Sequence, residues 1–155
     1  MKLLHSLALS IALLVGLWVY LSVGNPNFNL NPWIGFVAWA AFFAAGGAGD
    51  GAKKSLAAGL AAILLTAVTL YGVQQAGGGL TAMIVFISIL GFVLVAMADI
   101  SMLAYTPAAF LGAACFFGAG GKVDTSILFV LLSWVVGVGL GFVSEQFGKR
   151  MASAT

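Results

Sequence analysis

Apolar stretches follow one another along almost the whole chain, with only short polar segments between them. A helix needs about 20 apolar residues to cross a bilayer, and six segments of roughly this kind can be marked out. Charged residues make up 6% of the 155-residue sequence and hydrophobic residues 63%, whereas a soluble domain has about 25% charged residues. Too few polar side chains are present to cover a water-facing surface. We therefore expect the chain to be embedded in a lipid bilayer.

Clusters of polar and turn-forming residues separate the apolar segments. The expected spans are 3–23, 33–49, 55–74, 80–98, 105–120 and 126–147. Because the intervening segments are short, successive helices should be antiparallel neighbours. The sequence predicts an all-α polytopic membrane protein with one membrane domain over residues 1–155. The first run is longer than a typical signal-peptide core and lacks an A-x-A cleavage site, so we take it as a span; removal as a signal peptide is the alternative.

The basic residues indicate the orientation of the spans. Short loops rich in Lys and Arg stay in the cytoplasm. With a cytoplasmic N-terminus, only Lys122 falls on the outer side, and the cytoplasmic side holds Lys2, Lys53, Lys54, Lys149 and Arg150. We expect a multi-pass protein of the bacterial inner membrane with both termini in the cytoplasm.

One unusual phrase occurs twice. FFAAGGAGDG (42–51) and FFGAGGKVDT (116–125) lie 74 positions apart, and Gly16 and Pro32 precede the first as Gly91 and Pro107 precede the second. The chain therefore divides into repeat one, 1–76, and repeat two, 77–155. Three crossings per repeat place the second repeat upside down relative to the first, as in many transporters. Chance similarity between apolar sequences is the alternative.

Aromatic residues recur at matching positions of spans 2 and 5. Apolar rings that line a narrow passage can gate it by dewetting, and this predicts a pore or substrate path. The residues are Phe36, Trp39, Phe42 and Phe43 in the first repeat and Phe110, Phe116 and Phe117 in the second. Packing in the core or contact with lipid is the alternative for these rings.

The double glycines of the phrase are candidate helix breaks, since Gly-interrupted segments at matching positions point to a transporter site. They are Gly46, Gly47, Gly120 and Gly121; ordinary helix termination is the alternative. Asp50 and Asp124 follow them as candidate residues of the pathway mouths, or as solvated loop charges.

Several classes of site have no support in the sequence. No ionisable residue falls near the middle of an expected span, so a proton-driven pump is not favoured. Cys115 is the single cysteine, and no nucleotide-binding loop, HExxH or GxSxG motif occurs. The six basic residues form no stripe of the kind that binds nucleic acid. We expect no enzyme, no metal, no cofactor and no nucleic-acid partner.

Pairs of small residues four apart predict close helix packing in lipid. The pairs are Ala41/Ala45, Ala58/Ala62, Ala108/Gly112 and Gly137/Gly141. Some of these seams could join subunits, which leaves a homo-oligomer open.

PWIGFVAWAAFFAAGG (32–47), the following basic loop and AAGLAAILL (57–65) resemble the front half of a bacterial inner-membrane family of unknown function that includes YcdZ. PAAFLGAACFFGAGG (107–121) resembles that family's second half at Pro107, Phe110 and Gly112. The resemblance implies a small polytopic inner-membrane protein and brings no established substrate or functional residues.

Together these features favour a small channel or facilitator for a small neutral solute, such as a urea-like amide or ammonia. The alternatives are an alternating-access exporter of a small metabolite and a membrane scaffold or accessory subunit that transports nothing.

Overall fold

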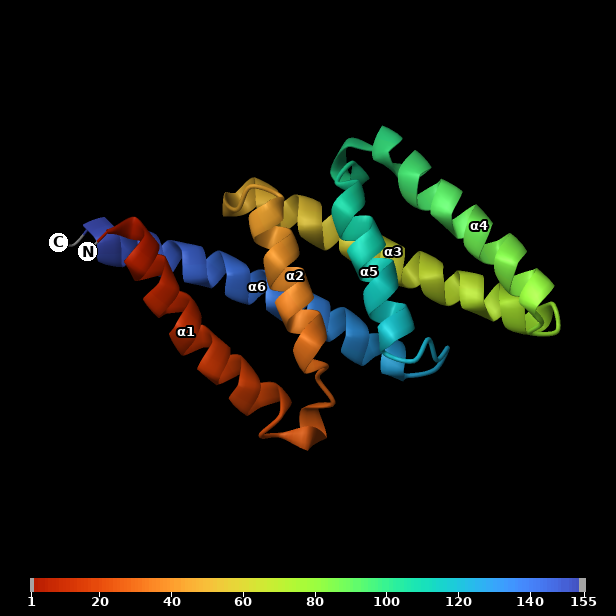
Figure 1. The fold of residues 1–155 in the computed structure, drawn as a ribbon, viewed down its shortest axis with the longest axis horizontal. Coiled ribbons are helices and arrows are strands. Elements are labelled where there is room, and N and C mark those ends of the chain that lie inside the picture. The colour runs from red at the N-terminus through yellow and green to blue at the C-terminus, as the bar shows by residue number, and fades with distance from the viewer. Residues whose placement is uncertain (1, 154–155) are drawn as a thin grey trace.

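The structure, a computed structural model, describes residues 2–153, which form six α-helices joined by turns and short 3-10 helices (Figure 1). The α-helices are α1 (Leu3–Ser22), α2 (Pro32–Ala44), α3 (Ala48–Gln75), α4 (Leu80–Ala96), α5 (Thr106–Gly118) and α6 (Ser126–Ser153). The 3-10 helices are η1 (Pro26–Phe28), η2 (Met97–Asp99) and η3 (Ser101–Leu103). No strand occurs over 2–153, so the predicted all-α class is confirmed. Met1, Ala154 and Thr155 of the predicted domain 1–155 lie outside the described residues.

The six α-helices differ in length. Four helical segments are long and apolar enough to cross a membrane: Leu3–Ser22, Ala48–Gln75, Leu80–Asp99 and Ser126–Ser153. The two others, α2 and α5, have 13 residues each, or about 20 Å at 1.5 Å per residue. The hydrocarbon core of a bilayer is about 30 Å thick. The predicted second and fifth spans are therefore too long, since these helices end at Ala44 and Gly118.

The predicted break at 49–54 is wrong, because α3 begins at Ala48 and runs through this segment. Asp50 therefore lies in the first turn of a helix, where a carboxylate is favoured by the helix dipole. At the other end of the chain, α6 continues past the predicted limit of 147 to Ser153. Lys149 in this extension forms an i,i+4 ion pair with Glu145, and Arg150 lies in the last turn.

The repeated FFxAGG phrase forms the same helix C-terminal cap in both places. The first glycine of each pair has a φ of +99°, a backbone conformation that glycine adopts without strain. The N–H of Gly47 donates to the carbonyl of Phe42 at 3.1 Å, and that of Gly121 to Phe116 at 3.0 Å. This pattern closes a Schellman motif. The glycine pairs thus terminate α2 and α5 by ordinary capping and do not interrupt a continuing helix.

The short helices lie across the long helices of the opposite half of the chain, α2 over α6 and α5 over α3 (Figure 1). Glycines allow the backbones to touch at both crossings. A Cβ atom on Gly137 would lie 2.4 Å from the carbonyl oxygen of Gly35, and one on Gly112 would lie 2.5 Å from that of Gly59. Such close approach stabilises helix pairs in lipid, where the hydrophobic effect does not drive them together.

The predicted small-residue seams pack the interior of this one chain. Seven of their eight residues are buried, namely Ala41, Ala58, Ala62, Ala108, Gly112, Gly137 and Gly141. Two indole side chains are also fully buried in the interior. Trp18 donates to the carbonyl of Pro32 at 2.8 Å and Trp134 to that of Ser55 at 3.1 Å, so neither polar N–H is left unpaired.

A second set of matching positions lies in α3 and α6, 78 residues apart instead of 74. Buried hydroxyls occur at Ser55 and Thr66 in α3 and at Ser133 and Ser144 in α6. Each donates to a carbonyl one turn earlier in its helix. The spacing between matching positions rises from 74 to 78 after the glycine pairs. This is because α3 starts directly after its glycine pair, whereas four additional residues separate the second pair from α6. Asp124 belongs to these additional residues, so it is not the positional counterpart of Asp50.

Candidate functional site

The predicted aromatic residues divide into buried rings and exposed rings. Trp39, Phe42 and Phe116 are buried. The exposed rings are Phe36, Phe43, Phe110 and Phe117, which are 36–48% exposed. Since these four occupy matching positions of α2 and α5, the short helices present two pairs of rings at the surface. Whether the rings line a path stays a prediction.

Two of the buried rings, Trp39 and Phe42, pack against α6. The rings of Phe42 and Phe142 meet edge to face with centroids 6.4 Å apart, and a Cβ on Gly141 would lie 2.7 Å from Phe42. The indole N–H of Trp39 donates to the hydroxyl of Ser144 at 3.1 Å. These contacts give Trp39 and Phe42 a packing role inside the chain.

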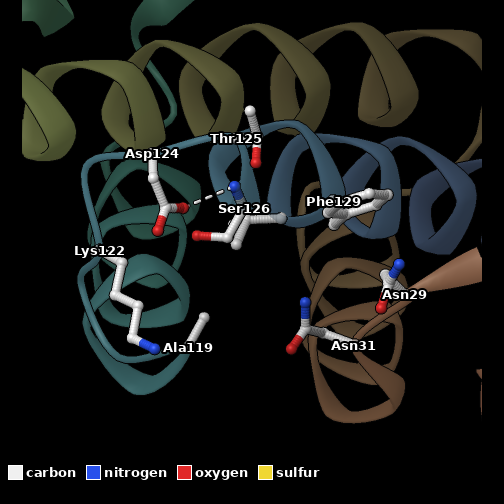
Figure 2. A pocket seen from close by; sticks show the side chains of 9 residues that line it. Asn29, Asn31, Ala119, Lys122, Asp124, Thr125, Ser126 and Phe129 are labelled. Carbon is white, nitrogen blue, oxygen red and sulfur yellow. Dashed lines mark hydrogen bonds between the residues drawn. The ribbon is translucent and has the colours of Figure 1, made fainter.

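A polar pocket of about 350 Å³ lies where the α1–α2 link meets the α5–α6 link. In Figure 2, Lys122 and Asp124 face it from the α5–α6 link, and Asn29 and Asn31 face it from the α1–α2 link. Asn29 has a positive φ of 49°, which asparagine tolerates better than most residues. The pocket therefore offers amide groups, one cation and one carboxylate to a small polar molecule.

Asp124 is held in place by the start of α6. The N–H of Ser126 donates to Oδ1 of Asp124 at 2.7 Å. Hydrogen bonds from the Ser126 hydroxyl and backbone N–H, with a smaller contribution from Lys122, lower the pKa of Asp124 below its usual value. The carboxylate is therefore ionised at neutral pH.

A second pocket of about 440 Å³ lies at the opposite edge of the molecule, beside the α2–α3 turn and the α4–α5 link (Figure 1). Asp50, Lys53 and Lys54 line it from the first turns of α3, and Ser101 and Met102 line it from η3. Both predicted mouth residues thus lie in end pockets, together with lysines. The sequence did not indicate Asn29, Asn31 or Ser101 for these pockets, because the links that carry them are distant along the chain.

Glu145 is a further residue that the sequence did not single out. It is 8% exposed, and its Oε2 accepts a hydrogen bond from the N–H of Ala48 at 2.6 Å. Its Oε1 pairs with Lys149. A Cβ on Gly47 would lie 3.0 Å from Oε2, so the carboxylate sits directly over the glycine turn. Glu145 therefore fastens the α2–α3 turn to α6.

Hydrogen bonds next to Glu145 also connect α1 and α2 to α6. Ser10 donates to the carbonyl of Ser144 at 2.8 Å, and Trp39 reaches the hydroxyl of Ser144 from α2. Three helices thus meet at one buried polar cluster. The position matching Glu145 in α3, 78 residues earlier, is Ala67, so the cluster exists on one side of the molecule only.

Residues that could hold a metal ion are not gathered anywhere in the range 2–153, where no group of three His, Cys, Asp or Glu side chains comes together. Cys115 is a free, buried thiol within α5.

Comparison with known proteins places the chain in a family. Residues 8–149 match the family described as "Protein of unknown function (DUF1097)". The chain is 29% identical over 160 residues to "Uncharacterized protein YahC" of Escherichia coli (strain K12), covering 98% of this chain and 94% of the relative. It is 28% identical over 154 residues to "Inner membrane protein YcdZ" of the same organism, covering 99% and 90%. No solved structure matches.

The relative YcdZ is the member named in the resemblance that the sequence suggested, so that prediction is confirmed. The match covers all six α-helices apart from the first residues of α1 and the last of α6. The chain belongs to the DUF1097 family of proteins of unknown function.

Proposed function

We propose that this chain is an inner-membrane facilitator for a small neutral solute, built from two inverted three-helix repeats. The inner-membrane location rests on the printed name of YcdZ together with the four membrane-length helices. The single observation that carries the transport proposal is the pair of pockets at opposite edges of the molecule, each bordered by a carboxylate and at least one lysine. Each would serve as one mouth of the pathway.

The inverted arrangement is supported by three features of the helices. The order of lengths is 20, 13 and 28 residues in the first half and 17, 13 and 28 in the second. The caps of α2 and α5 have the same hydrogen bonds. A half-turn in the plane of Figure 1 carries the course of α1, α2 and α3 approximately onto that of α4, α5 and α6. On this arrangement both termini lie in the cytoplasm.

We place the apolar part of the pathway along the exposed faces of α2 and α5. The opposite faces of these helices are in backbone contact with α6 and α3, which leaves no room for a solute there. Phe36, Phe43, Phe110 and Phe117 are exposed. Two copies that meet at this face would enclose the rings and create a constriction without a charged group. A homo-oligomer is therefore part of the proposal.

The chemistry of the mouths favours a small solute that both donates and accepts hydrogen bonds. Asn29, Asn31 and Asp124 supply acceptors at one mouth, and Lys122 supplies donors. A urea-like amide or ammonia fits this set, and an ion would lose its hydration at the apolar constriction. We propose no enzymatic activity for this chain.

The test is solute flux into proteoliposomes that contain the purified protein, measured by stopped-flow light scattering with urea, formamide, acetamide and glycerol. Fast flux that does not saturate is expected for at least one amide. Phe43→Ala and Phe117→Ala should raise or broaden the flux, because each widens the constriction. Phe147→Ala is the matched control, since Phe147 is an exposed ring on α6 outside the proposed path.

The other outcomes separate the alternatives. Slow flux that saturates would favour an exporter with alternating access. Absence of flux for every solute, with protein that remains folded, would favour a scaffold or accessory subunit. Unchanged flux in both phenylalanine variants would remove the aromatic constriction from the proposal.

A further inference from the structure

The helix α4 is attached to the rest of the molecule far more loosely than its counterpart α1. Ser10 and Trp18 join α1 to α6 and to the start of α2 by hydrogen bonds, and Gly148 makes room for Leu7 against α6. Over residues 2–153, no side-chain hydrogen bond is recorded between α4 and another helix. Only Leu90 and Leu94 of α4 are buried.

Hollows lie along this loosely held helix. One of about 250 Å³ is formed by α4 and α5 and includes Leu94 and Ala114. A second of about 400 Å³ continues toward the end of α3, and a third of about 420 Å³ follows the first turns of α4. All three share Ile87, so they adjoin one another, and we call them together the α4 groove.

The absence of an indole helps to explain why the α4 groove is open. In the first half, Trp39 fills the space between α2 and α6 and is 5% exposed. The matching position in α5, 74 residues later, is Ala113, which lines the groove. In the register that pairs Gly16 with Gly91, the residue that matches Trp18 is Val93, a partly exposed aliphatic side chain in place of an indole.

The lining of the α4 groove specifies the chemistry of an occupant. The part near Leu94 and Phe110 is formed by apolar residues alone. Gln74 and the backbone of Gly78, Gly120 and Gly121 lie at the other end, and none of the three hollows is lined by a charged residue. An elongated apolar molecule with one uncharged polar end matches this gradient.

The length of the α4 groove points to the same class of molecule. From Leu80 to Leu94 the rise of the helix amounts to about 21 Å at 1.5 Å per residue. One leaflet contributes about half of a hydrocarbon core that is about 30 Å thick. The groove is therefore long enough for one acyl chain that lies within a leaflet.

We propose that the α4 groove is a binding site for a single-chain, uncharged amphiphile from the bilayer, of the monoacylglycerol or long-chain alcohol type. The chain of the amphiphile lies between α4 and α5, and its hydroxyl hydrogen-bonds to Gln74 and the exposed glycine carbonyls. The α4 groove shares the rings of Phe110 and Phe117 with the proposed constriction, but it is occupied from the lipid and not from the end pockets.

The experiment is photolabelling of the full-length protein in proteoliposomes with a long-chain alcohol that carries a diazirine in its alkyl chain. Peptides of the segment 87–117 should be labelled in a saturable manner, and excess unlabelled alcohol should compete. An alkyl sulfate of equal length should compete poorly, because its charge has no partner in the groove.

Ala114→Trp tests the position of the site. Ala114 is exposed, so an indole there fills the groove without entering the packed interior. Labelling should fall by about tenfold or more, since exclusion of two methylene groups from apolar burial has roughly that effect on affinity. Ala40→Trp is the matched control at the equivalent exposed position of α2 and should leave labelling unchanged. Gln74→Leu should weaken competition by the alcohol.

Two results would overturn the proposal. In the first, labelling never saturates and is as strong on α1 and α6 as on the segment 87–117. The probe would then be reacting from the surrounding lipid and not from a bound position. Saturable labelling that Ala114→Trp leaves unchanged in a folded protein would place the site elsewhere. Neither result depends on solute flux. The labelling experiment therefore tests the lipid site, and the flux experiment tests the proposed transport function.

Discussion

Glu145→Ala should release the α2–α3 turn from α6 and lower the free energy of unfolding. The lost hydrogen bond to the N–H of Ala48, 2.6 Å long, involves a charged acceptor and contributes about 1.5–3 kcal/mol. The carboxylate also lies at the N-terminus of α3, where a negative charge contributes about 0.3–1 kcal/mol. The ion pair adds little, because the side chain of Lys149 is 51% exposed and such pairs contribute under about 1 kcal/mol. We expect a loss of about 2–4 kcal/mol in total.

Steric trapping in bicelles measures this free energy, and hydrogen exchange followed by mass spectrometry reports on residues 48–51. Glu145→Gln keeps an acceptor oxygen and loses the charge, so about half of the loss is expected, because charge-assisted bonds are roughly twice as strong as neutral ones. Asp99→Ala removes an exposed carboxylate and is the control. Wild-type stability and unchanged exchange at residues 48–51 in Glu145→Ala would refute the fastening role of this side chain.

Three further predictions concern packing, pH and the polar mouth. Gly112→Ala and Gly137→Ala should each destabilise the protein by about 1–3 kcal/mol through overpacking, because the new methyl would meet a backbone oxygen at 2.5 and 2.4 Å. Thermal unfolding in detergent measures this, and Gly91→Ala, with nothing within 4 Å of its Cβ, should be neutral; equal effects would contradict the account. Hydrogen bonds with Ser126 lower the pKa of Asp124, so their stabilisation is present above the carboxyl's ordinary pKa and is lost as the pH falls through the lowered value. The protection factor of the Ser126 amide, which corrects for the intrinsic pH dependence of exchange, should fall over that acidic range and stay constant in Asp124→Asn; a constant protection factor in the wild type would contradict the link. Asn31→Leu should reduce amide flux in proteoliposomes by removing a polar group from the pocket, whereas Asn27→Leu, on the same link but outside the pocket, should not; equal flux in both would remove Asn31 from the mouth.

The sequence was sufficient to predict the helical class, the number of helices and the equivalence of the two glycine pairs. These follow from local properties: the length of apolar runs, and the positive φ that ends a helix at Gly46 and Gly120. The extent of α3 was not predictable from the same signals. The segment GDGAKK reads as a loop because of its glycines and charges, yet the Schellman cap reverses the chain so tightly that Ala48 already starts the next helix.

The site residues were harder to predict, because their roles depend on contacts between distant segments. The sequence cannot distinguish the exposed phenylalanines of α2 from the buried one, because they are the same residue type in one apolar run. Only the crossing of α2 over α6 decides that Phe42 is buried and Phe43 exposed. The importance of Glu145 depends on Ala48, 97 positions away in sequence. A repeat comparison that allowed four additional residues after the second glycine pair would have detected Ser55 with Ser133 and Thr66 with Ser144.

The central claim is that the two glycine-pair turns lie on opposite sides of the bilayer. In a Cys115→Ala background, single cysteines at Gly49 and Lys122, both in exposed positions, can be labelled with a membrane-impermeant maleimide in intact spheroplasts and again after lysis. The account predicts that Lys122→Cys reacts before lysis and Gly49→Cys only after it. Reaction of both cysteines under the same condition would contradict the inverted arrangement, and with it the two-mouthed pathway.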